Sequence, residues 1–187
     1  MLSLKNLQKE TRKKGVNAQT IQHAISNLWL DHTYIIFNAY LFEWESDYFS
    51  VSESNQVYEV EIKVTKNDFK KDFKKVDKHV LLESKSEPLK LPNKFFYATH
   101  RGLLQTYKIP EYAGLIEISE TATGMEAEIV KNAPFLHREN VFDEVKPGLL
   151  NKFYHKYRRT EYDNLQLNEE IQRLKEQLKS KNDDKWH

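Results

Sequence analysis

Three side chains, Asp47, Glu61 and Lys63, are of types that together hydrolyse phosphodiester bonds. Two or three carboxylates at one point form the hard oxygen site that Mg²⁺ prefers. An adjacent ammonium can orient or activate a water molecule and offset charge on a phosphate. An acid on one strand, followed by acid-x-lysine on the next, therefore indicates metal-dependent cleavage of a nucleic acid.

Two predicted strands position these side chains. From Val57 to Thr65 apolar residues alternate with charged ones, which is the period of a strand with one buried face. The stretch from Trp44 to Val51 is strand-like in its aromatic and β-branched content. Residues 52–56 are polar turn formers that suit a hairpin loop. The hairpin is expected to bring Asp47 near Glu61 and Lys63. Glu45 and Glu59 lie on the same strand faces. They are therefore second-line candidates for metal or water contacts.

A basic helix is expected directly after the second strand. The Thr65-Lys66-Asn67-Asp68 segment has the form of a capping box, and apolar residues then recur at helical spacing through Val80. That spacing predicts one helix whose apolar stripe faces the core and whose lysines are exposed. Lysines near a polyanion gain from counterion release, so this face is a candidate DNA-binding surface. Its expected nucleic-acid contacts are Lys66, Lys70, Lys71, Lys74 and Lys78, joined by Arg101 from the end of a later strand.

Other segments predict the rest of an α/β domain. Apolar residues from Asn17 to Leu30 have core-facing helical spacing, with Asn17 or Thr20 as the cap. Residues 33–42 are either a first strand or an irregular lead into the next one. Residues 94–99 and 114–119 read as strands, and 125–130 completes an edge hairpin. We expect a central mixed sheet flanked by helices.

The sequence around these motifs resembles that of a known family. Asp47 with Glu61-Ile62-Lys63 is similar to the PD-(D/E)XK nuclease superfamily, and residues 59–79, with FFYATH and EYAGLIEIS downstream, resemble more narrowly the MmcB-like DNA repair proteins and their phage-encoded relatives. The resemblance spans roughly residues 38–120. It implies a restriction-endonuclease-like core, DNA as substrate, a role in DNA repair or phage DNA processing, and a Mg²⁺ or Mn²⁺ cofactor. The implied catalytic residues are Asp47, Glu61 and Lys63, and the implied metal ligands are Asp47, Glu61 and, as a second-line candidate, Glu45. The resemblance also implies His79 as a nucleic-acid contact.

The C-terminal part is expected to be a helical extension. Residues 131–150 contain Pro134, Pro147 and Gly148 and read as a connector, which sets a nuclease-like domain at 1–150 and an extension at 151–187. Residues 153–178 keep the four-three spacing of a coiled-coil seam, with two polar positions. Either this helix pairs with a second copy of the chain, giving a homodimer, or it packs against its own domain. A short basic amphipathic helix is also predicted within residues 1–17.

Composition restricts the remaining functions. The 187 residues carry a formal net charge of +1, so the chain as a whole makes no case for a polyanion partner. There is no cysteine, which excludes disulfides, thiolate zinc sites and a cysteine nucleophile. No stretch has the apolar length of a membrane span, and we expect a cytoplasmic protein without membrane contacts. The competing hypothesis is a catalytically silent DNA-binding or adaptor module that uses the basic helix and the coiled coil.

Overall fold

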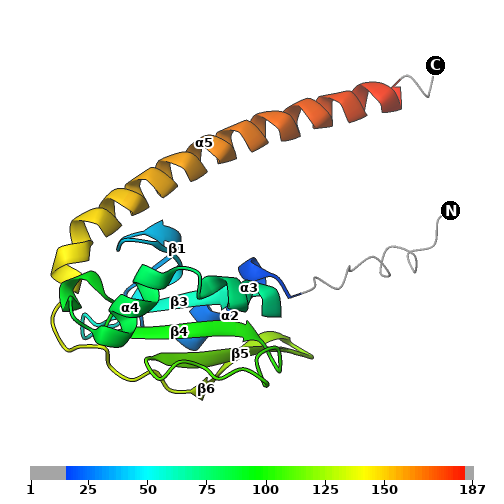
Figure 1. Ribbon diagram of the computed structural model, residues 1–187. Helices are drawn as coiled ribbons and strands as arrows, with labels where there is room; N and C mark the ends of the chain where they lie inside the picture. The colour runs from blue at the N-terminus through cyan, green and yellow to red at the C-terminus, as the bar shows by residue number, and fades with distance from the viewer. Residues whose placement is uncertain (1–15, 184–187) are drawn as a thin grey trace. The chain divides into compact units, whose positions relative to one another are not determined.

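The computed structural model describes residues 16–183, with side chains described to residue 180 (Figure 1). The helix predicted within residues 1–17 therefore lies almost wholly outside the described residues. The chain divides after Val145 into two compact units. Among the described residues, no helix is both long and apolar enough to cross a membrane.

A six-stranded sheet forms the first unit, with the strands side by side in chain order. The neighbours β1–β2, β2–β3 and β5–β6 pair antiparallel, whereas β3–β4 and β4–β5 pair parallel. The sheet is thus mixed, and the carboxyl ends of β3, β4 and β5 lie at one edge. The strands are β1 (Tyr34–Tyr40), β2 (Glu45–Val51), β3 (Val57–Lys63), β4 (Lys94–His100), β5 (Ala113–Thr121) and β6 (Gly124–Lys131).

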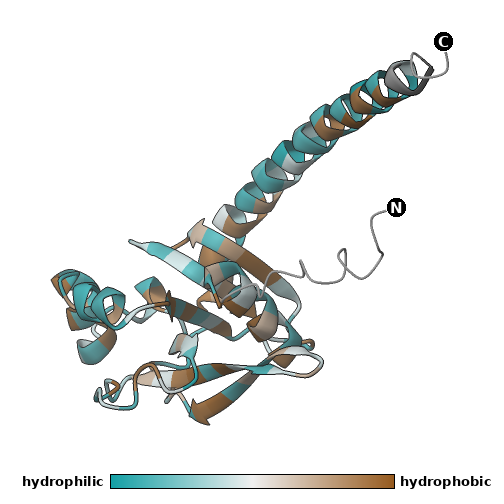
Figure 2. Ribbon diagram, turned by 90° about the vertical axis from the view of Figure 1, so that its right-hand side faces the viewer, coloured by the Kyte–Doolittle hydropathy of each residue, from teal (hydrophilic) through white to brown (hydrophobic). Residues whose placement is uncertain are grey.

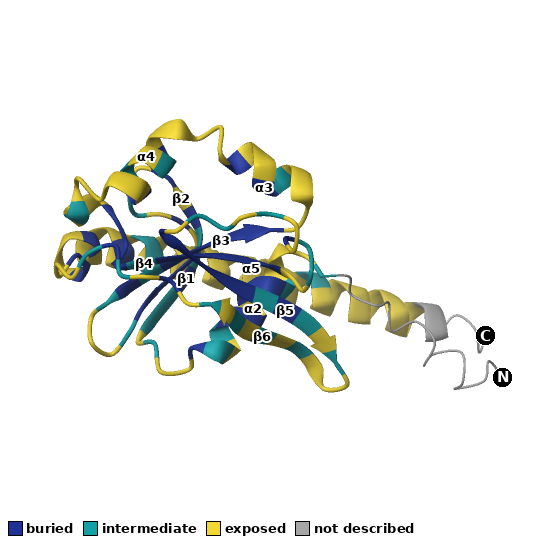
Figure 3. Ribbon diagram, turned by 60° about the horizontal axis from the view of Figure 1, so that its bottom comes forward, coloured by how far each residue is buried: buried dark blue, intermediate teal, exposed yellow. Residues whose placement is uncertain are grey.

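Helices cover both faces of the sheet. The helix α2 (Ala18–Leu28) lies on one face, while α3 (Lys66–Asp72) and α4 (Val76–Ser84) lie on the other (Figures 1 and 3). A single 3-10 turn, η1 (Pro88–Lys90), leads from α4 toward β4. Each face has its own hydrophobic core: Ile21 and Ile25 of α2 pack with Val60 and Phe96, and Phe69 of α3 and Leu82 of α4 lie in the opposite core.

The predicted α/β fold class is confirmed, and local signals explain why. Asn17 caps α2 by accepting from Thr20 N, and the Thr20 hydroxyl accepts in return from Asn17 N. The β4 strand is buried on both faces, as its central place requires. In β5 there is no room for a side chain at Gly114, since a Cβ would lie 2.4 Å from Phe96 Cδ1 and 2.7 Å from the Ala133 backbone nitrogen.

The prediction of a single basic helix after β3 is wrong. Thr65 does cap a helix by accepting from Asp68 N, but that helix ends at Asp72 and a second begins at Val76. The predicted core stripe fails with it, because Phe73, Val76 and Val80 are exposed. Polar residues take the buried positions instead: Asp72 and Lys78 are each at most 3% exposed. We attribute the break to the charged face of β3. That face lies beneath both helices, and polar side chains of the helices pair with its charged groups.

The C-terminal helix α5 (Phe142–Asp183) begins earlier than predicted and contains Pro147. Pro147 is the sixth residue of this helix, so its missing N–H removes one backbone hydrogen bond, to the Asp143 carbonyl. Asp143 and Glu144 in the first turn favour a helix start there, because carboxylates interact well with the N-terminal end of the helix dipole. The segment that connects β6 to a helix is therefore about half as long as expected, at residues 132–141.

Candidate functional site

The structure brings the three predicted catalytic side chains together at the end of β3. The antiparallel pairing of Tyr48 with Val60 sets Asp47, one residue before Tyr48, beside Glu61, one residue after Val60. Asp47, Glu61 and Lys63 all line one pocket of about 310 Å³. Its other lining residues come from β3 and the residue after it, from the N-terminal end of α2, from α3 and from the α3–α4 turn, and they are Ala18, Ile62, Val64, Asp68, Lys71, Asp72 and Lys75.

Asp47 is held from two sides. Its Oδ2 accepts a hydrogen bond from Ile62 N at 2.7 Å, and its backbone carbonyl accepts one from Gln22 Nε2 at 2.9 Å. The same Gln22 nitrogen also donates to Oδ1 of Asn38, whose φ of 50° interrupts the regular β1–β2 pairing. Burial, with a further contribution from the Glu61 carboxylate, raises the pKa of Asp47 to about 6.

Glu61 is enclosed by ammonium groups. Its Oε1 lies 2.8 Å from Lys63 Nζ and 3.3 Å from Lys75 Nζ, and its Oε2 lies 2.6 Å from Lys78 Nζ. Although burial acts to raise it, the pKa of Glu61 is lowered by Lys78 and Lys63. Both carboxylate oxygens are therefore already paired with cations of the chain itself.

Asp72 is a second buried acid at this site, and sequence reasoning missed it. Its Oδ1 is 3.1 Å from Lys63 Nζ, and its Oδ2 accepts from Tyr97 OH at 2.9 Å. Burial acts to raise the pKa of Asp72, but His79, Lys78 and Lys63 hold it far below its usual value. Lys63 is thus fixed between two carboxylates. The one available signal was that Asp72 follows the core residue Phe69 by three positions on the same helix.

Lys78 was predicted on the surface of the basic helix, and this is wrong. Its side chain is 2% exposed, and its Nζ lies 3.4 Å from Glu59 Oε1 as well as 2.6 Å from Glu61. The ammonium also lies over the rings of Trp44 and Phe95. Glu59 is fully buried, accepts from Trp44 Nε1 at 2.6 Å, and has its pKa raised by burial against the opposing effect of Lys78. The lysine run across α3 and α4 therefore includes one residue, Lys78, whose ammonium neutralises buried acids of β3.

The other predicted site residues lie apart from the pocket or at its margin. Glu45 is exposed on β2 and does not line the pocket. His79 is half-buried, with Nδ1 2.5 Å from Tyr112 OH and Nε2 3.1 Å from the Asp72 carbonyl. Arg101 pairs with Glu128 on β6. The lysines that remain exposed, as predicted, are Lys66, Lys70, Lys71 and Lys74.

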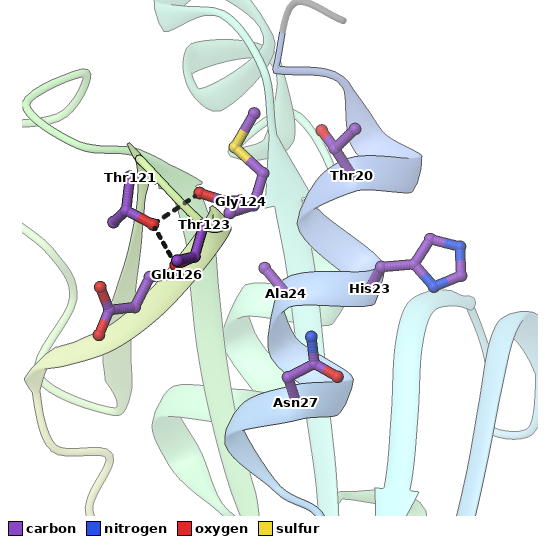
Figure 4. Close-up of a pocket in the computed structure, with 9 residues that line it drawn as sticks. Thr20, His23, Ala24, Asn27, Thr121, Thr123, Gly124 and Glu126 are labelled. Atoms are coloured by element: carbon purple, nitrogen blue, oxygen red, sulfur yellow. Dashed lines mark hydrogen bonds between the residues drawn. The ribbon is translucent and has the colours of Figure 1, made fainter.

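A second pocket, of about 620 Å³, lies between α2 and the β5–β6 hairpin (Figure 4). Thr121, whose hydroxyl bonds to Thr123 and to the Gly124 carbonyl, shapes its hairpin side. None of the predicted catalytic residues lines it. Its size therefore does not make it the candidate site, because the titratable groups with perturbed pKa values lie in the smaller pocket.

Two acids of the site suit a magnesium ion by donor type. Among the described residues no group of three or more His, Cys, Asp or Glu side chains is arranged to hold a metal. Magnesium, however, commonly keeps several waters and uses one or two carboxylates. Asp47 and Glu61 supply such a pair in one pocket, and the Glu61 carboxylate adds to burial in raising the pKa of Asp47. The donor set therefore fits the ion, with Glu61 also held by lysines.

Fold and site together define an α/β protein with a buried acid–lysine cluster at the end of a central parallel strand. No family model matches the chain, and no curated protein matches it significantly. A solved structure, the SPO1766 protein of unknown function from Silicibacter pomeroyi, is similar with a TM-score of 0.57 and 14% sequence identity. The match covers 78% of this chain and 90% of that one. At this identity the likeness concerns the fold alone.

Proposed function

We propose that the chain is a metal-dependent deoxyribonuclease of the PD-(D/E)XK type. The observation that carries this proposal is that Asp47, Glu61 and Lys63 line one pocket at the end of β3. The chain order of helix, three antiparallel strands, helices and a parallel strand agrees with the restriction-endonuclease-like core that the sequence resemblance implies. The proposal keeps the cytoplasmic location expected from the sequence, and a role in DNA repair or phage DNA processing.

Each side chain has a distinct role in this proposal. Asp47 and Glu61 would hold Mg²⁺ or Mn²⁺, which when bound polarises the scissile phosphate and lowers the pKa of a water molecule. Lys63, fixed between Glu61 and Asp72, orients the attacking water and offsets charge on the phosphate. Ile62 N and Gln22 keep Asp47 in place.

Exposed lysines next to the pocket supply the DNA-binding surface. Lys71 lines the pocket itself, and Lys66, Lys70 and Lys74 lie on or just after the same helix, α3. Contacts from these ammoniums go to phosphates, so binding is expected to be insensitive to sequence and to weaken steeply with salt.

Cleavage of labelled single-stranded, duplex and branched DNA with Mg²⁺ or Mn²⁺ tests the proposal. The variant is Asp47→Asn, which keeps an acceptor for Ile62 N, and the matched control is Glu45→Gln, an exposed acid two residues away on the same strand. We expect metal-dependent cutting by the wild type and the control, and none by Asp47→Asn. The metal should also raise the melting temperature of the wild type and the control but not of Asp47→Asn.

A second candidate function, a catalytically silent DNA-binding module, is favoured by one observation. Lys63, Lys75 and Lys78 already pair with both oxygens of Glu61, so the acid has its counterions without a metal. This candidate predicts no cutting of any substrate, no metal-dependent stabilisation, and DNA binding equal in the wild type and Asp47→Asn. Substituting Lys66, Lys70 and Lys74 by alanine would then weaken binding and reduce its salt dependence.

A further inference from the structure

The second unit carries an apolar stripe whose side chains are exposed. On α5 the side chains of Tyr157, Leu167, Ile171, Leu174 and Leu178 are 46–64% exposed. Figure 2 shows brown, hydrophobic bands recurring along a mainly hydrophilic helix. They recur with Thr160 and Asn164 at spacings of three and four residues, which is a heptad seam. Water contact over so much apolar surface is unfavourable, so the stripe favours a partner.

The residue types at the seam favour a coiled coil of two parallel helices. With Tyr157 at position a, Ile171 also falls at a, while Leu167 and Leu174 fall at d. A β-branched residue at a with leucine at d is the combination preferred by parallel dimers. Asn164 falls at a as well, and a single buried asparagine at this position specifies register and a two-stranded state at some cost in stability.

Charges beside the seam point to a second copy of the same chain. In a parallel, in-register pair each g residue faces the e residue five positions later on the other helix. This sets Lys156 against Glu161 and Glu170 against Lys175, so both fully charged pairs are of opposite sign. Two copies of this helix are therefore complementary to each other in charge when they pair in this register.

We propose that α5 forms a parallel, in-register homodimeric coiled coil through residues 157–178, with Asn164 facing its own counterpart. This goes beyond the proposed nuclease function and does not depend on it. The pairing joins two copies of the sheet unit in one particle.

Two neighbouring leucines provide a matched test in the full-length chain. Leu167 at d and Leu165 at b are 60% and 58% exposed, so in a monomer aspartate at either position has the same effect. In sedimentation equilibrium we expect the wild type and Leu165→Asp to be dimeric, and Leu167→Asp to be monomeric with an unchanged sheet unit. A monomeric wild type, or equal dissociation of both variants, would overturn the proposal.

Orientation is tested by cross-linking, because the chain has no cysteine of its own. Leu178→Cys places a thiol at a, where a parallel in-register pair brings it against its counterpart, and Ser180→Cys places one on the outer surface. Under mild oxidation we expect a disulfide-linked dimer from Leu178→Cys at least tenfold faster than from Ser180→Cys. Equal rates, or no cross-link from Leu178→Cys in a dimeric protein, would exclude the parallel register.

Discussion

Replacing Lys78 by methionine is expected to destabilise the protein severely, because this lysine neutralises buried acids. Its Nζ lies 2.6 Å from Glu61 Oε2 and 3.4 Å from Glu59 Oε1, and the three side chains are at most 5% exposed. Glu61 keeps Lys63 and Lys75 in the variant, but Glu59 keeps only its hydrogen bond from Trp44. Glu59 is therefore the group left with an uncompensated charge.

The magnitude follows from that unpaired carboxylate. Removing one partner of a buried ion pair costs about 3–5 kcal/mol, which is a large share of the roughly 5–15 kcal/mol by which a domain is stable. Methionine retains most of the apolar stem, so little of the loss comes from packing. Glu59 can relieve the charge by taking a proton, since burial already raises its pKa. The cost should therefore be smaller at pH 5 than at pH 8.

Urea unfolding followed by circular dichroism measures the effect, with Lys75→Met as the matched control. Lys75 also pairs with Glu61, at 3.3 Å, but its side chain is 51% exposed, so its loss should cost less than about 1 kcal/mol. The double variant Lys78→Met/Glu59→Gln should recover much of the lost stability, because both charges are then absent. If Lys78→Met were no more destabilising than Lys75→Met, the buried pairing would be refuted and Lys78 would be a surface lysine after all.

Three further substitutions test the packing and the electrostatics of the sheet unit. Gly114→Ala forces a Cβ to within 2.4 Å of a Phe96 ring carbon and should lower the free energy of unfolding, measured by urea, by at least about 1–3 kcal/mol; an unchanged free energy of unfolding would contradict the close contact. Asp47 has a folded pKa of about 6, above its unfolded value, so its ionisation opposes folding; in metal-free buffer Asp47→Asn should gain stability relative to the wild type as the pH rises from 4 to 7, and a constant difference would contradict this. Asp72 has a folded pKa below its unfolded value, so Asp72→Asn should cost about 3 kcal/mol at pH 7 and the difference from the wild type should shrink as the pH falls below about 4; a pH-independent cost would show that lost packing dominates.

Short-range patterns in the sequence predicted most of the fold. The alternation in β3, the capping residues Asn17 and Thr65, and the β5–β6 hairpin each depend on residues within a few positions of one another. Such interactions form in any context that leaves them intact, so the elements and the α/β class were predictable.

Helical periodicity failed between residues 73 and 80 because it assumes that apolar residues face the core. Here the surface beneath the helices carries Glu59 and Glu61, and burying these acids requires cations above them. The chain breaks its helix after Asp72, and Lys78 takes a buried position while Val76 and Val80 face the solvent.

The sequence by itself determined that Asp47, Glu61 and Lys63 lie near one another. Strand alternation and a hairpin of ordinary length suffice to set Asp47 beside Glu61 and Lys63, because both are local geometric constraints. Only the tertiary structure decided how those groups are held: Gln22 on Asp47, and Asp72 with Lys78 around the Glu61–Lys63 pair. These partners lie 9 to 25 residues away along the chain, where electrostatic compensation of buried charge, rather than any periodic pattern, selects the neighbour.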